Sequence, residues 1–104
     1  MPLSAQDTRR FRAIGHHLKP ILIFGGNGLS DAFTSELDAR LEDHELIKVR
    51  INAENRDDRN AVIAALLEAS AAELVQRVGN VALLYRAAKK PNPKLSNILR
   101  AQQG

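Results

Sequence analysis

The sequence contains no cysteine, and aromatic residues make up only 4% of its 104 positions. Without cysteine the chain has no disulfide, no thiolate nucleophile and no sulfur-ligated zinc site, which fits a reducing compartment. Helical and strand periodicity place Phe11, Phe24 and Phe33 in the core, which leaves Tyr85 as the one ring for stacking on a base. An RNA-recognition motif needs two or three exposed rings on its sheet, so we exclude that class of module.

Long hydrophobic runs are also missing. No apolar stretch approaches the roughly 18 to 20 residues that span a bilayer, and the start Met1–Ser4 lacks the basic and apolar regions of a secretory signal. We therefore expect a cytoplasmic protein without membrane attachment. A composition of 44% hydrophobic and 26% charged residues is typical of a soluble globular protein, and the length predicts a single domain with one core.

Positive charge is concentrated at the two ends of the chain. Residues 1–19 carry a net charge of +3 and residues 86–104 a net +5, whereas residues 20–85 carry a net −5. If the fold brings the ends together, they form one basic surface that attracts a polyanion. The alternative is that basic termini merely keep the chain soluble, and the charge distribution alone does not decide between the two hypotheses.

The first half of the sequence predicts two helices and two strands. Ser4 and Asp7 form a capping box for a helix over about residues 5–16, for which Gly15 and Pro20 are stop signals. The apolar run 21–24 predicts a strand buried on both faces. Ser30 caps a helix over about 29–43, and the alternation in 46–51 predicts a strand with one covered face and with Lys48 and Arg50 on the other.

The second half predicts a helix, a hairpin and a tail. Asn55 begins a helix that runs to about Ala69, and the dipeptide Gly79-Asn80 joins strands over about 74–78 and 81–86. Pro91 and Pro93 predict that residues 88–104 form a mobile tail without regular structure. The order α-β-α-β-α-β-β predicts an α/β fold with a mixed four-stranded sheet packed by helices.

The stretch Gly25-Gly26-Asn27-Gly28 lies between a strand and a helix. Glycines permit close backbone approach, and free amides beside the positive end of a helix hold phosphate oxygens, so this loop favours contact with a nucleic-acid backbone. A purely structural turn is the alternative. The loop lacks the lysine of a nucleotide P-loop and the third glycine of a dinucleotide fingerprint, so we expect no nucleotide cofactor.

The first helix carries three arginines, Arg9, Arg10 and Arg12, but a single acid, Asp7. The excess of positive charge favours binding of an external anion. Lys48 and Arg50 either extend this patch or are simply solvated. Nothing marks a catalytic site, because His16 and His17 diverge by about 100° on a helix, which makes them a poor metal pair, and no nucleophile lies in a known motif. We expect no enzyme, no metal and no small-molecule substrate.

Several spaced segments resemble one family. His17-Leu18-Lys19-Pro20, the loop through Leu29, the run His44–Val49 and the stretch from Gly79 to Leu84-Tyr85-Arg86 together resemble the CRM domain in its stand-alone, YhbY-like bacterial form, over about residues 3–88. The resemblance implies a fold similar to the C-terminal domain of a bacterial translation initiation factor. It also implies an RNA-binding domain over 1–88, followed by a basic tail over 89–104, and we expect the protein to be a monomer.

The resemblance implies that the partner is RNA, namely ribosomal RNA of large-subunit precursors, and that the protein assists ribosome maturation. The variable loop positions Gly26 and Asn27 are uncharged here, so affinity must come from amides and neighbouring cations. The other hypothesis is a protein–protein interaction module with incidental basic ends. The expected RNA contacts are Gly25, Gly26, Asn27, Gly28, Arg9, Arg10, Arg12, Lys19, Arg86, Lys89 and Lys90.

Overall fold

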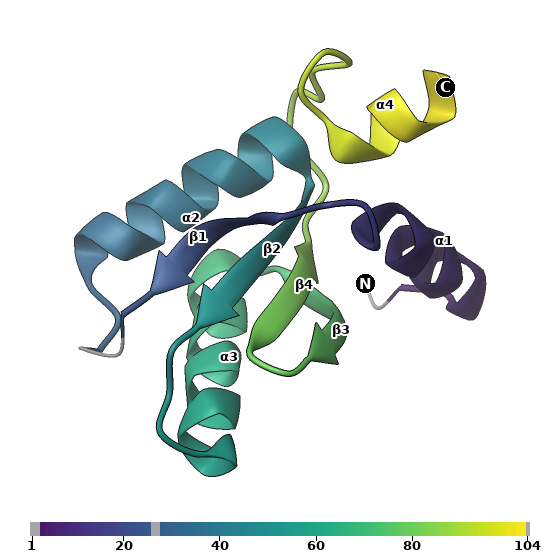
Figure 1. Cartoon of the computed structure of the whole chain (residues 1–104). Coiled ribbons are helices and arrows are strands. Elements are labelled where there is room, and N and C mark those ends of the chain that lie inside the picture. Colours follow the sequence, from purple (N-terminus) through teal and green to yellow (C-terminus); the bar gives the residue numbers. More distant parts are fainter. Residues whose placement is uncertain (1–2, 26–27, 104) are drawn as a thin grey trace.

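A computed structural model describes residues 3–25 and 28–103 and shows a mixed sheet with helices on both faces (Figure 1). The strand order is β1-β2-β4-β3, in which β1 runs parallel to β2 and the other two pairs are antiparallel. The predicted α/β class and mixed sheet are therefore confirmed. The elements are α1 (Ala5–Gly15), β1 (Pro20–Phe24), α2 (Asp31–His44), β2 (Leu46–Ile51), α3 (Arg56–Ser70), β3 (Glu73–Val78), β4 (Val81–Tyr85) and α4 (Asn97–Gln103).

Side-chain caps begin the first three helices at the positions that the sequence predicts. The Ser4 hydroxyl accepts from the Asp7 amide at 3.0 Å, and the Ser30 hydroxyl accepts from the Phe33 amide at 3.1 Å. The Asn55 side chain does the same for the amide three residues later in α3, at 2.9 Å. Each cap satisfies a backbone N–H that has no partner inside the helix, so it defines the start of the helix locally.

Two hydrophobic clusters lie on opposite faces of the sheet, where the sequence predicted one core. Helices α2 and α3 cover one face and bury a large cluster that includes Leu37, Leu66 and Val49. On the other face, Phe11 of α1 and Ile98 of α4 pack on sheet residues such as Leu83. The central strand β4 explains the second cluster, because Ala82, Leu83 and Leu84 are buried in succession and so place apolar side chains on both faces of the sheet.

The prediction that β1 is buried on both faces is wrong. Ile21 is 45% exposed and Ile23 is 62% exposed, and Phe24 is the fully buried member of the strand. The reason is topological: β1 is an edge strand that pairs with β2 alone, and α1 packs against β2 and β3 instead. One face of β1 therefore stays open although its composition is that of an interior strand.

The prediction that the C-terminal segment lacks regular structure is wrong for residues 97–103, which form α4. The Ser96 hydroxyl donates to the carboxylate of Glu45 at 2.7 Å, and the side-chain amide of Asn97 donates to the Leu46 carbonyl at 2.7 Å. Ser96 and Ile98 are buried. A short helix is marginal alone in water, and here tertiary contacts with α1 and β2 hold it in place.

Gly15 allows α1 to approach the sheet closely. A Cβ atom at this position would lie 2.5 Å from Leu83 Cδ2 inside the second cluster. We expect Gly15→Ala to lower the free energy of unfolding by about 1–3 kcal/mol, because the buried Leu83 must leave its rotamer. Urea unfolding followed by far-ultraviolet circular dichroism measures this. Gly25→Ala is the matched control, since nothing lies within 4 Å of its Cβ position, and equal losses in both variants would contradict the packing role.

Candidate nucleic-acid interface

The glycine loop is exposed at both of its described ends. Gly25 and Gly28 are solvent-accessible, and a Cβ atom built on either meets nothing within 4 Å. Gly28 has φ of +82°, a left-handed conformation that glycine adopts without strain. The predicted contacts Gly26 and Asn27 lie outside the described residues. The ends of the loop therefore leave the backbone open to close approach by a ligand.

The helix that follows the loop offers less to an anion than the sequence pattern suggests. The Ser30 hydroxyl already occupies the Phe33 amide, and Asp31 places a carboxylate in the first turn of α2. A negative side chain there offsets the positive end of the helix dipole. An anion held at this loop thus depends on the backbone of the loop itself and on cations from elsewhere in the molecule.

Helix α1 presents its three arginines to solvent, with three different environments. Arg9 forms no ion pair within the described part of the chain, whereas Arg10 pairs with Asp7 at 3.6 Å and its guanidinium lies 4.9 Å from the Phe11 ring centroid. Arg12 donates to the Val75 carbonyl at 3.4 Å. An exposed pair such as that of Arg10 contributes little to stability, so all three charges remain available to a polyanion.

The fold brings the two basic ends of the chain together. Helices α1 and α4 are in contact, and Ile14, His17 and Arg100 line a hollow between them. In Figure 1 both helices lie at the opposite end of β1 from the glycine loop. Lys19 is exposed at the residue before β1, between helix α1 and the strand that leads to the glycine loop. The strand alone has five residues, or about 16 Å at the usual rise, so a ligand must be long to contact both ends.

Lys89 and Lys90 are exposed, but their backbone is anchored. Both amides donate to the carboxylate of Glu42, at 3.2 Å for Lys89 and 3.1 Å for Lys90. The hydrogen bond from Lys90, and to a smaller extent that from Lys89, holds the pKa of Glu42 below its ordinary value. The side chains of both lysines are left on the surface, near the C-terminal end of α2.

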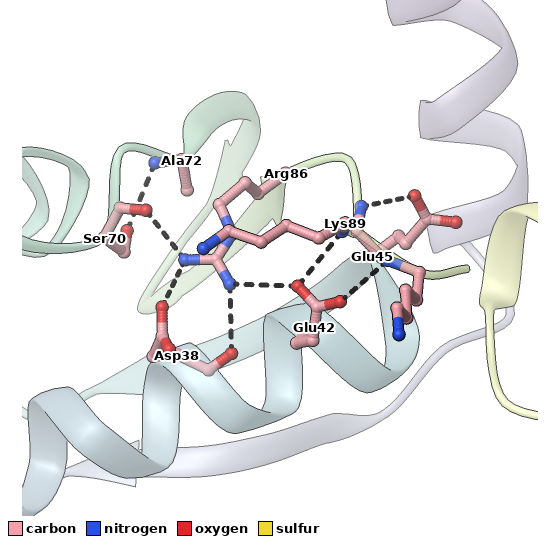
Figure 2. A network of polar contacts seen from close by, with 9 residues as sticks. Asp38, Glu42, Glu45, Ser70, Ala72, Arg86 and Lys89 are labelled. Carbon is pink, nitrogen blue, oxygen red and sulfur yellow. Dashed lines mark hydrogen bonds and ion pairs between the residues drawn. The ribbon is translucent and has the colours of Figure 1, made fainter. Parts of the chain in front are cut away.

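Arg86 lies in an internal network rather than on the basic surface (Figure 2). Its guanidinium donates to the Asp38 carboxylate, to the Asp38 carbonyl at 3.1 Å and to the Ser70 carbonyl at 3.0 Å, and lies 3.8 Å from Glu42 Oε1. The side chain is 20% exposed. Arg86 therefore joins α2 and the end of α3 to β4, and we leave it out of the interface proposed below.

Two basic residues on the face of the sheet that α1 partly covers, Lys48 and Arg50, were not in the list of expected RNA contacts. Arg50 is exposed on β2, and Ile23 lies beside it on β1 in the parallel register. Lys48 is half-buried and donates to the Leu18 carbonyl at 3.0 Å. The alternation of β2 predicts that Lys48 and Arg50 share one face of the sheet. The sequence does not predict that this face is open between α1 and the glycine loop, because that follows from the position of β1 at the edge of the sheet.

Tyr85 is not a free stacking platform. Its ring packs on Phe11 with centroids 4.6 Å apart, and the residue is half-buried. Burial raises the pKa of its hydroxyl. Within residues 3–25 and 28–103, no cluster of three or more histidine, aspartate or glutamate side chains could hold a metal ion, and no helix is long and apolar enough to cross a membrane.

The comparisons with known proteins agree with this architecture. Residues 3–86 match the CRS1 / YhbY (CRM) domain. The chain belongs to this family. It is 48% identical over 100 residues to the probable RNA-binding protein PA4753 of Pseudomonas aeruginosa, covering 96% of each chain. It is 32% identical over 93 residues to a protein of Haemophilus influenzae named RNA-binding protein, covering 89% of this chain and 94% of that one.

A solved structure confirms the CRM fold. The solution structure of the hypothetical protein SAV1595 from Staphylococcus aureus superposes with a TM-score of 0.75 at 33% identity, over 91% of this chain and 98% of that one. The family match ends at Tyr85-Arg86, so the docked segment that includes α4 follows the matched domain.

Proposed function

We propose that the protein binds RNA, with the glycine loop against the phosphate backbone and the basic surface of α1 and α4 against phosphates farther along the strand. The proposal rests on one observation: the open glycine loop and the arginine-bearing helix α1 lie at opposite ends of β1, separated by the length of that strand. A single nucleotide cannot reach both, whereas a polynucleotide can. The RNA-binding names of two similar family members support the choice of RNA.

The proposed target is structured ribosomal RNA of large-subunit precursors, with the protein acting as a monomer in the cytoplasm during ribosome maturation. Such a role needs no catalytic chemistry. Gradient sedimentation of cell extract in low and high salt tests it: we expect the protein to travel with large-subunit precursors in low salt and to leave them in high salt. Sedimentation with the free-protein fraction in low salt would count against this target.

A negative charge placed in the loop tests its contact with the backbone. We expect Gly25→Asp to lower RNA affinity by about tenfold, because a carboxylate repels phosphate where the backbone must approach closely. Gly25 suits this test better than Gly28, whose positive φ would add strain to any substitution. Filter binding with a structured ribosomal RNA fragment provides the measurement.

The neutral variant Gly25→Ala separates charge from bulk, and it is expected to retain most of the affinity. Unfolding curves of both variants should match that of the wild type, since the added side chains meet no neighbour. An unchanged affinity in Gly25→Asp would remove the loop from the interface and leave the cationic surface as the whole site.

A further inference from the structure

A hollow beside the glycine loop has a composition that phosphate contacts do not explain. It encloses about 930 Å³, within the range of roughly 300–1,000 Å³ of small-molecule sites. Its lining includes Gly25 and Gly28 from the ends of the glycine loop and Ala61 and Ala65 from α3. In Figure 1 the glycine loop and the first half of α3 both lie at the end of the molecule away from α1 and α4.

The lining of this hollow combines small apolar side chains of α3 with two carboxylates and with the amides of Asn52 and Asn80. Ala61, Val62 and Ala65 follow one face of α3 and leave a flat surface without long side chains. Glu54 and Asp58 also line the hollow, and neither forms an ion pair with any other described residue. Glu54 and Asp58 repel a phosphate placed directly beside them, but their carboxylates accept hydrogen bonds from N–H groups.

We propose that the hollow holds one unpaired nucleobase bearing an exocyclic amino group, and that the phosphate of the same nucleotide lies beside Gly25 and Gly28. The inference rests on the proposed RNA binding and adds a base preference to it. A planar base fits against the alanine surface, and its amino group donates to Asp58 or Glu54. Uracil carries a carbonyl oxygen where cytosine carries the amino group, so it places an acceptor against these carboxylates.

Decamers of cytidine and uridine test the preference by fluorescence anisotropy at fixed salt. We expect the wild-type protein to bind the cytidine decamer about tenfold more tightly than the uridine decamer. Asp58→Asn combined with Glu54→Gln should bring this ratio close to one, since the acceptor charges are removed. Asp57→Asn is the matched control, because it removes an equivalent first-turn acid from α3 that does not line the hollow, and its ratio should stay at about ten.

A steric pair of variants tests occupancy independently of charge. Ala61→Leu fills the hollow, whereas Ala64→Leu adds the same atoms at an exposed position of α3 that does not line it. We expect Ala61→Leu to lower cytidine-decamer affinity about tenfold and Ala64→Leu to change it less than twofold. Unfolding curves check that both variants fold with similar stability.

The outcomes separate this inference from the proposed function. If neither decamer nor a structured ribosomal RNA fragment binds, the proposed function itself fails. If RNA binds and Gly25→Asp weakens it, but both decamers bind equally and Ala61→Leu has no effect, the loop contact stands and the base site is overturned. A loss of the cytidine preference in Asp57→Asn equal to that in the double variant would also overturn it.

Discussion

Replacement of Arg9, Arg10 and Arg12 by glutamate is expected to lower RNA affinity by more than about hundredfold at moderate salt. Each arginine that neutralises a phosphate releases counterions, so three lost contacts should also reduce the slope of log affinity against log salt by about 2 to 3. Filter binding over a series of salt concentrations measures both quantities. The slope is the sharper readout, because a merely unstable protein would lose active fraction without changing its salt dependence.

Two further variants guard this result against effects on folding. Arg9→Glu alone disturbs no ion pair among the described residues, and it should lower affinity about five- to tenfold with an unchanged unfolding curve. Arg40→Glu reverses one charge on α2, which packs on the opposite face of the sheet, and should lower RNA affinity less than Arg9→Glu does. It also breaks the exposed ion pairs of Arg40 with Glu36 and Asp43, so its unfolding curve is measured alongside its affinity. Retained affinity and slope in the triple variant would instead favour a protein partner or a binding site elsewhere.

Substitution of Arg86 is expected to cost stability rather than RNA affinity. Arg86→Ala should lower the free energy of unfolding by about 1–3 kcal/mol, because it leaves the Ser70 and Asp38 carbonyls and the Asp38 carboxylate without their guanidinium donor and removes the ion pair with Glu42. Arg86→Lys should recover little of this loss, since an ammonium cannot reproduce the planar fork that reaches α2 and α3 together. Urea unfolding followed by circular dichroism gives both values.

Lys89→Ala is the control for this second prediction. Lys89 is three residues away and exposed, and the hydrogen bond that it makes to Glu42 comes from its backbone amide, which alanine retains. We expect a change within about 0.5 kcal/mol. RNA affinity measured on the folded fraction of Arg86→Ala should remain within twofold of the wild type. A stable Arg86→Ala protein with strongly weakened RNA binding would return Arg86 to the interface.

Fold class and helix starts were predictable from the sequence because their causes are local. Ser4, Ser30 and Asn55 cap helices by hydrogen bonds that span three residues, and the pair Gly79-Asn80 closes a hairpin in which Gly79 takes a positive φ. Apolar periodicity then indicates which side of each element packs. These signals require no knowledge of which element lies next to which.

The exposure of β1 and the role of Arg86 were not predictable in the same way. An interior-like strand such as Ile21–Phe24 becomes an edge when its other neighbour is absent, and the pairing order β1-β2-β4-β3 has no local signature. Arg86 meets Asp38 and Ser70 across 48 and 16 positions of sequence. From the sequence alone, a basic residue at the end of a strand is therefore equally compatible with exposure to solvent, contact with RNA or an internal network.

Residue order alone thus accounts for the element types, the caps, the glycine loop and the concentration of positive charge at the two ends of the chain. Folding adds that α1 and α4 pack together, that β1 separates them from the loop, and that Gly25 and Gly28 line a hollow together with Glu54 and Asp58. The physical reason is range. Capping and periodicity act within a few residues, whereas burial and ion pairing depend on surfaces that meet only after long segments of chain have closed on one another.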